Sequence, residues 1–265
     1  MFSQDPDWEF HPLQGETGDA FMGVRDNERV FFKRNISPFT PTLSAKGIAP
    51  KLKWTQRTYS GDILTAQEWH EGHTLERGDM NSNRVIQLIK HVHESENLLE
   101  TFQKIGGEVK RPVDFINAYF DDLPESLAEH KFFNQVIADL ESEIDNDFYD
   151  IEYTVCHGDL NHHNFLLNDD DQLFLVDWEQ CSISDPMSDI TKLLVQYIRG
   201  KDWLSWLNRY GTDVTAQEYK RIKWYSQMNA LFIIKQYHRE NQIHKVNDMI
   251  LLLRIIHQDD TKYKE

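Results

Sequence analysis

Cysteine is scarce in this sequence, with only Cys156 and Cys181 among 265 residues. Two cysteines cannot form the disulfide framework that stabilises many small secreted domains. The first residues, MFSQDPDWEF, do not place a basic segment before an apolar one, as a signal peptide does. We therefore expect a cytoplasmic protein in a reducing compartment.

Long apolar runs and an excess of positive charge are also missing. The longest apolar runs, such as residues 249–253, reach about a quarter of the length that spans a bilayer. The chain carries 28 Lys and Arg residues against 44 Asp and Glu residues, which gives a formal net charge of −16. Apolar runs this short predict no membrane insertion. Because nucleic acids bind basic surfaces, the negative net charge predicts no nucleic-acid partner.

The first quarter of the chain has the pattern of a β-sheet. Hydrophobic residues make up 40% of the sequence and aromatic residues 12%, which is typical of a folded globular protein. Over residues 9–33, short apolar stretches are separated by glycines and by Asp26-Asn27, which predicts three strands. The segment ILTAQEW, residues 63–69, predicts another strand. We interpret residues 1–72 as a small antiparallel β lobe that binds nucleotide.

From about residue 81 the apolar pattern changes to helical spacing. Val85, Ile89 and Val92 fall on one face of a predicted helix, and Asp185 followed by Pro186 is a favourable helix start. We predict further helices over residues 132–144, 202–210, 215–239 and 243–257. Residues 73–265 are interpreted as a larger, mainly helical lobe, so the predicted fold class is α+β with two lobes.

The segment HGDLNHHNFLL, residues 157–167, carries the strongest functional signal. Asp159 and Asn164 lie in a polar loop between two apolar stretches, and Asp177 follows the next apolar stretch. Phosphoryl transfer requires a carboxylate that orients the attacking hydroxyl, and hard oxygen ligands that hold Mg²⁺ against the phosphates. The spacing therefore predicts Asp159 as the catalytic base and Asn164 and Asp177 as the metal ligands.

These motifs resemble those of the aminoglycoside phosphotransferase, choline kinase and homoserine kinase superfamily. The resemblance implies a protein-kinase-like fold and the ATP- and Mg²⁺-dependent phosphorylation of a small-molecule hydroxyl. Asp185 and Asp189 are similar to the DP-x-x-D segment that opens the next helix in that superfamily. Only 11 residues separate Asp177 from Asp189, which leaves no long activation segment to dock a peptide acceptor.

The resemblance also implies a nucleotide site between the two lobes. Lys33 resembles the strand lysine that reaches the ATP phosphates, although no acidic residue lies between Lys33 and Asp62 to pair with it. We predict no clear helix between Lys33 and Ile48, where the proline-rich SPFTPT lies. The other residues assigned to the nucleotide are Gly15, Thr17 and Gly18 in a glycine loop, and Gln67, Glu68, Trp69 and Glu71 in a hinge.

Several residues near the motifs have more than one interpretation. A zinc site built on Cys156 and nearby histidines has no standard spacing and lacks a second sulfur ligand. Aromatic residues in the last helices are typical of a core, and the alternative is a cage for a cationic acceptor, formed by Trp203, Trp206, Trp224 and Tyr225. The candidates for acceptor binding or a structural role are His157, His162, Trp178, Glu179 and Asp185, and we interpret His157 as structural.

The motifs do not specify the acceptor. Beyond them, the whole chain resembles the bacterial CcrZ/YtmP-type cell-cycle regulator kinases, which implies contacts with division and replication-initiation proteins. On that basis we favour a sugar or nucleoside acceptor, in particular ribose or a riboside. The alternatives are a choline- or aminoglycoside-type kinase, a pseudokinase, and a kinase-fold scaffold that acts through its protein partners.

Overall fold

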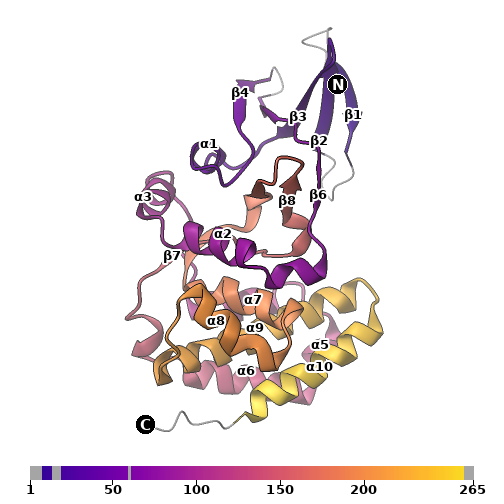
Figure 1. The fold of residues 1–265 in the computed structure, drawn as a ribbon. Coiled ribbons are helices and arrows are strands. Elements are labelled where there is room, and N and C mark those ends of the chain that lie inside the picture. Colours follow the sequence, from indigo (N-terminus) through magenta and orange to yellow (C-terminus); the bar gives the residue numbers. More distant parts are fainter. Residues whose placement is uncertain (1–7, 14–18, 59–60, 260–265) are drawn as a thin grey trace.

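A computed structural model describes residues 8–13, 19–58 and 61–259 of the chain. Gly15, Thr17 and Gly18 of the predicted glycine loop lie outside the described residues. Strands form one end of the molecule and helices form the other (Figure 1). In the part of the chain that is described, no helix combines the length and the apolar character needed to cross a membrane.

The N-terminal end is a five-stranded antiparallel sheet with the strand order β1-β2-β3-β5-β4. These strands are β1 (Glu9–Pro12), β2 (Ala20–Arg25), β3 (Glu28–Arg34), β4 (Leu52–Arg57) and β5 (Ile63–Glu68). β2 and β3 meet at Asp26 and Asn27, whose φ angles of 48° and 68° fit a tight hairpin turn. Val30, Phe32 and Ala66 are buried on one face of the sheet. The predicted antiparallel β lobe is confirmed.

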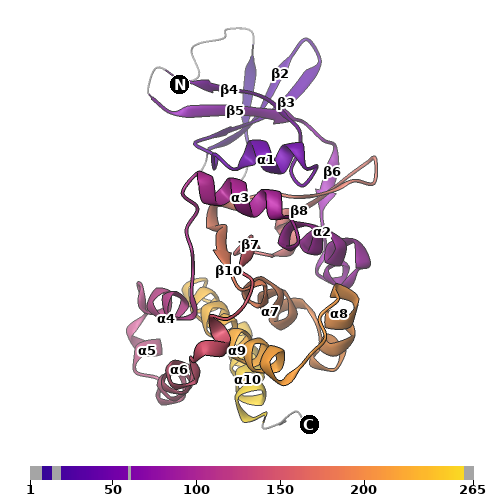
Figure 2. The ribbon, with the colours of Figure 1, turned by 90° about the vertical axis from the view of Figure 1, so that its left-hand side faces the viewer.

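A short helix, α1 (Thr40–Ala45), lies between β3 and β4, so the prediction of no helix in this segment is wrong. Pro41 occupies the first turn of α1, where its missing N–H leaves no helical hydrogen bond unmade. The proline-rich segment therefore allows a helix, which begins at Thr40. The ring of Phe39, which precedes α1, lies 4.7 Å from that of Phe102 on α3 (Glu96–Lys104), so the two helices lie side by side (Figure 2). α1 contains no acidic residue that could pair with Lys33.

Short strands connect the sheet to the helical lobe. β6 (Gly72–Thr74) pairs with β8 (Phe165–Asn168), which also pairs with β9 (Leu173–Leu175). β7 (Thr154–Cys156) pairs with β10 (Ser182–Ser184). The apolar stretches on either side of the HGDLNHHN loop therefore form strands, while the lobe boundary at residue 72 stays a prediction.

The helical lobe surrounds one hydrophobic core. Its helices are α2 (Asn83–His93), α3, α4 (Pro112–Phe120), α5 (Glu125–Ala128), α6 (Lys131–Glu143), α7 (Pro186–Tyr197), α8 (Trp203–Tyr210), α9 (Ala216–Arg239) and α10 (Ile243–Gln258). Short 3-10 helices are η1 (Arg77–Asn81), η2 (Asn146–Phe148), η3 (His162–Asn164), η4 (Trp178–Gln180) and η5 (Gly200–Asp202). The Asp185 side chain caps α7 by accepting a 2.9 Å hydrogen bond from the N–H of Met187, which confirms the predicted helix start.

Candidate active site

The catalytic loop follows β7, and Asp189 of α7 holds its start in place. The Asp189 carboxylate accepts hydrogen bonds from the backbone N–H groups of His157, at 2.6 Å, and Gly158, at 2.8 Å. Gly158 has a φ of 81°, and a Cβ there would lie 2.4 Å from the backbone oxygen of Gln180. Only glycine fits this position, so the turn into the loop depends on it.

His157 is buried beneath the loop and connects two of its neighbours. Its Nε2 lies 2.9 Å from the backbone oxygen of Val176, and its Nδ1 accepts the N–H of Asp159 at 3.2 Å. Burial lowers the pKa of His157, so the ring is neutral and donates through Nε2 alone. These contacts give His157 a structural role in holding the loop.

Asp159 has both carboxylate oxygens engaged by donors. Oδ1 lies 2.8 Å from the ammonium of Lys192, and Oδ2 accepts amide hydrogens from Asn161 at 2.6 Å and Asn164 at 3.2 Å. Burial raises the pKa of Asp159, but the charge and hydrogen bond of Lys192, together with His157 and Asn161, outweigh burial and the pKa is lower than usual. Asp159 is therefore an ionised carboxylate in one fixed orientation, which suits a group that positions a hydroxyl.

Asn164, at the end of η3, and Asp177, in the segment after β9, are brought together by a backbone hydrogen bond. The N–H of Val176 donates to the backbone oxygen of Asn164 at 2.8 Å. Asn164 directs its amide N–H groups at Asp159, which leaves its side-chain oxygen for another ligand. Asp177 has a left-handed φ of 66°, which Asp adopts more readily than most residues, and its side chain is 49% exposed. An amide oxygen and a carboxylate are ligands that Mg²⁺ accepts, so the donors fit the predicted metal.

Lys33 reaches from β3 into the other lobe. Its Nζ lies 3.0 Å from Oδ1 of Asp177 and 2.7 Å from Oε1 of Glu179. Burial lowers the pKa of Lys33, but the two carboxylates outweigh burial and raise the pKa above its usual value. Glu179 on η4 is therefore the acidic partner that the segment after Lys33 lacks.

A pocket of about 360 Å³ lies beside this ion pair. Its polar lining residues include Lys33, Gln67, Glu68, Asp177 and Glu179, and its apolar ones include Leu13, Phe31, Ala49, Trp69 and Leu166. An apolar wall with charged groups at one end suits a flat base joined to phosphates. The structure therefore brings the predicted strand lysine, three of the predicted hinge residues and one metal ligand to the same pocket.

Glu71 does not line this pocket, and its assignment to nucleotide binding stays a prediction. Its carboxylate pairs with Arg29 and accepts the indole N–H of Trp69 at 3.1 Å. The Gln67 side chain also turns away from a ligand, because it donates to the backbone oxygen of Pro50 at 2.9 Å. Any contact of Gln67 with a base would therefore use its backbone.

Two of the candidate acceptor-binding residues have structural contacts. Trp178 is buried and donates its indole N–H to the backbone oxygen of Leu175 at 2.8 Å. Asp185 is fully buried and lies 2.9 Å from Arg221. Burial raises the pKa of Asp185, and the Arg221 charge opposes this only in part. His162 remains beside the loop, where its Nδ1 lies 3.0 Å from the hydroxyl of Tyr197.

The aromatic cage does not form from the residues expected for it. Trp206 and Trp224 are 0% exposed and Tyr225 is 1% exposed, so all three belong to the core. Trp203 is partly buried and donates to the backbone oxygen of Ile198 at 2.9 Å. Helical spacing of large aromatic residues reflects core packing here.

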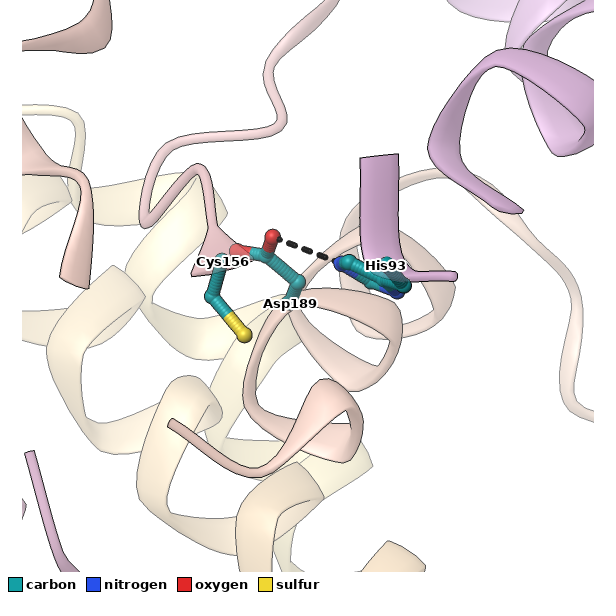
Figure 3. A group of neighbouring side chains, drawn as sticks. All are labelled: His93, Cys156 and Asp189. Carbon is teal, nitrogen blue, oxygen red and sulfur yellow. Dashed lines mark hydrogen bonds and ion pairs between the residues drawn. The ribbon is translucent and has the colours of Figure 1, made fainter. Parts of the chain in front are cut away.

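His93, Cys156 and Asp189 form a buried cluster behind the loop (Figure 3), with possible ligand atoms within 4.8 Å of one another. Nε2 of His93 lies 3.2 Å from Asp189, whose carboxylate also accepts the two loop N–H groups. Burial raises the pKa of Cys156 well above its usual value, so the thiolate that a metal needs is disfavoured. The cluster fits a support for the loop better than a metal centre.

Sequence reasoning missed Lys192. Its ammonium bridges Asp159 and the backbone oxygen of Gly158, at 2.8 Å and 2.9 Å. Lys192 lies three residues after Asp189 on α7, so both side chains project from the same face of the helix. That spacing is the one signal in the sequence that could have placed Lys192 at the loop.

Residues 36–225 match the phosphotransferase enzyme family, APH, a segment that contains Asp159, Asn164 and Asp177. The chain belongs to this family. Among its curated relatives, protein LicA of Haemophilus influenzae is 24% identical over 232 residues, which cover 81% of this chain and 79% of LicA.

Solved structures of similar proteins share the two-lobed architecture. Choline kinase LicA from Streptococcus pneumoniae has a TM-score of 0.66 and 17% identity, over 94% of both chains. The GDP complex of an aminoglycoside 2′-phosphotransferase has a TM-score of 0.64 and 14% identity, over 96% of this chain and 94% of that one. The predicted protein-kinase-like fold is confirmed, and family membership shows a phosphotransferase that acts on a small-molecule hydroxyl.

Proposed function

We propose that this protein is an ATP- and Mg²⁺-dependent kinase that transfers the γ-phosphate to a hydroxyl of a small molecule. The observation that carries the proposal is the 3.0 Å contact between Lys33 and Asp177 at the wall of the interlobe pocket. In phosphoryl transfer a lysine in this position binds phosphate oxygens, and a carboxylate in this position binds the metal. Their contact supports a site for the triphosphate at this end of the pocket.

Each residue has a distinct part in this proposal. Asn164 and Asp177 hold the metal, which when bound neutralises charge on the phosphates. Lys33, released by Asp177, binds phosphate oxygens while Glu179 continues to orient it. Asp159 positions the acceptor hydroxyl and receives its proton, and Lys192 fixes the carboxylate of Asp159.

Two classes of acceptor are candidates. The named relatives, a choline kinase and an aminoglycoside phosphotransferase, support a cationic alcohol, and the comparisons favour this class over the other. Ribose or a riboside is the class favoured by the resemblance to CcrZ/YtmP-type regulators. The choice between a cationic and an uncharged acceptor also depends on the positive charges of Lys192 and Arg77, which lie beside the catalytic loop.

The same resemblance supports a role in bacterial cell-cycle control for a cytoplasmic kinase of this kind. Such a protein would contact division and replication-initiation proteins. Binding of those partners that survives the loss of Asp159 would favour a scaffold that is independent of catalysis.

The test is acceptor-dependent ADP formation by the purified protein with Mg²⁺ and ATP. The acceptor panel contains choline, ethanolamine, kanamycin, ribose and several ribosides, and Asp159→Asn is the matched control. We expect one class of acceptor to stimulate turnover by the wild type and not by the control. ATP binding without stimulation by any acceptor would instead favour the pseudokinase or scaffold alternative.

A further inference from the structure

Arg77 of η1 lies on the face of the Tyr197 ring at the end of α7. The guanidinium carbon is 4.7 Å from the ring centroid, and the side chain also donates to the backbone oxygen of Gln196 at 2.6 Å. Arg77 is exposed, while Tyr197 is partly buried. These two contacts fix an exposed positive charge on one aromatic face.

Tyr197 joins this charge to the catalytic loop. Its hydroxyl accepts the backbone N–H of His162 at 3.2 Å and lies 3.0 Å from the Nδ1 of the same residue. His162 is three residues after Asp159 in the loop. Burial raises the pKa of Tyr197, and the charges of both Arg77 and Asp159 act on that hydroxyl. Both Arg77 and the catalytic carboxylate therefore lie close enough to Tyr197 for their charges to act on it.

The charged side chains beside Asp159 and Tyr197 are the cations Lys192 and Arg77, whereas the buried Asp189 binds the backbone at the start of the loop. Lys192 lies 2.8 Å from Asp159 and neutralises it, so Arg77 adds an unbalanced positive charge. Among the described residues, the side-chain contacts of Asp159, His162 and Tyr197 include no second carboxylate.

We propose that Arg77 determines the acceptor specificity of this kinase by excluding alcohols that carry a positive charge. An aromatic face is the surface that binds quaternary ammonium groups, and here the protein's own guanidinium occupies it. A cationic acceptor could not stack on the Tyr197 ring and would be repelled by the charge of Arg77. An uncharged alcohol would also lack the contact with the ring, but it would not be repelled. The acceptor class is then a hydroxyl compound without positive charge. This inference rests on the proposed kinase function, because it takes Asp159 as the place where the acceptor hydroxyl arrives.

The test compares choline with 3,3-dimethyl-1-butanol, its uncharged isostere in which carbon replaces nitrogen. Dissociation constants for both are measured by ligand-observed NMR in the presence of Mg-ATP, for the wild type and for Arg77→Met. Met keeps an apolar stem on the Tyr197 ring and removes the charge. The matched control is Arg254→Met, since Arg254 lies 4.6 Å from the Phe132 ring centroid on another part of the surface.

We expect the wild type and Arg254→Met to prefer the uncharged isostere by at least about tenfold, and Arg77→Met to lose most of that preference. The proposal is overturned if the wild type binds choline as tightly as the isostere, if neither compound binds, or if Arg77→Met keeps the wild-type ratio. A circular-dichroism melt checks that each variant is folded, and Arg77→Gln gives a second variant of the same kind. Turnover of the panel acceptors is measured separately. Absence of phosphate transfer would contradict the kinase proposal, whereas an unchanged binding ratio would contradict the role of Arg77.

Discussion

Oδ1 of Asp177 lies 3.0 Å from Nζ of Lys33, although the two residues are 144 positions apart in the chain. The contact joins the β-sheet lobe to the segment after β9, at the pocket between them. It also shows how the lysine is held without an acidic residue on α1, because Glu179 supplies the second carboxylate. The Lys33–Asp177 contact therefore defines the end of the pocket where phosphates and metal would lie.

Asp177→Asn tests the metal assignment. Asn tolerates the left-handed backbone that Asp177 adopts, so the fold should be kept while the charge is removed. We expect Mg-ATP binding and turnover to be lost, with a melting temperature close to that of the wild type because the side chain is 49% exposed. Calorimetric titration with Mg-ATP measures the binding.

The control for this prediction is Glu179→Gln, which removes the neighbouring charge and leaves the metal ligands in place. Glu179→Gln should weaken nucleotide binding through Lys33 but keep measurable turnover. Normal turnover by Asp177→Asn at ordinary Mg²⁺ concentrations would contradict the assignment.

Asp159→Ala should separate chemistry from nucleotide binding. In the proposed mechanism Asp159 contacts the acceptor hydroxyl and not the nucleotide. Its loss should therefore lower kcat by ~10²–10⁴-fold, the usual contribution of a general base, and leave the affinity for ATP almost unchanged. Product formation with the best panel acceptor gives kcat, and calorimetry gives the ATP affinity. Transfer at the wild-type rate would show that Asp159 is not the base.

The local parts of the site could be predicted from the sequence, because neighbouring residues form them. Asp159 and Asn164 lie in one loop between two apolar strands, and the loop length sets their separation. The start of α7 was predictable for the same reason, since Asp185 and Pro186 act on the helix that they begin. Periodicity likewise located α2, α6, α9 and α10.

The contacts between distant segments could not be predicted in the same way. Lys192 reaches Asp159 only because α7 is oriented about its axis so that this side chain faces the loop. Glu71 belongs to the predicted hinge, yet its side chain pairs with Arg29 of β3 and does not line the pocket. α1 was missed because Pro41 was interpreted as a helix breaker, whereas its position in the first turn allows a helix.

Lys192→Met should impair transfer without weakening ATP binding. The change removes the donor that fixes Oδ1 of Asp159 and the 2.9 Å bond to the backbone oxygen of Gly158. We expect kcat to fall by roughly tenfold or more, since misplacing a catalytic group is costly. Lys192→Arg keeps the charge and should recover part of the loss. A fall in ATP affinity with unchanged kcat would argue against a role in positioning Asp159.

Asp189→Asn should destabilise the whole protein, because it alters a buried carboxylate that His93 and two loop N–H groups share. Because hydrogen bonds to a charged group contribute about 1.5–3 kcal/mol each, we expect a loss of at least this size in the free energy of unfolding. Urea unfolding followed by circular dichroism measures this. The control is Asp171→Asn, whose exposed ion pair with Arg84 should contribute no more than about 1 kcal/mol. Equal losses for the two variants would contradict the role given to Asp189.

The stabilisation by Asp189 should also depend on pH. Burial raises the pKa of Asp189, but the hydrogen bond and charge of His93 and the loop N–H groups outweigh burial and lower it below the ordinary value of 3.8. A carboxyl whose pKa is lower in the folded state stabilises the protein above its unfolded pKa and ceases to do so as the pH falls through the folded pKa. The difference between wild type and Asp189→Asn should thus shrink as the pH falls below about pH 4.

The two cysteines should be unreactive in the folded protein at neutral pH. Burial raises the pKa of Cys181 to about 11, and raises that of Cys156 well above its usual value. The thiolate is the reactive form, so at pH 8 only about one Cys181 thiol in a thousand is ionised. Labelling by iodoacetamide should therefore be slow, and should accelerate about tenfold for each pH unit up to about pH 11, because the acid form persists until the raised pKa is reached.

Cys181→Ser isolates Cys156, which is 1% exposed and should be labelled only on unfolding. Mass spectrometry of the alkylated protein gives the rate for each residue, and the same protein in urea gives the reference rate for both thiols. In urea both cysteines should react as ordinary thiols do, since unfolding removes the burial that raises their pKa values. Labelling of Cys181 at pH 8 as fast as in urea, with native circular dichroism retained, would show that burial does not raise the pKa of its thiol.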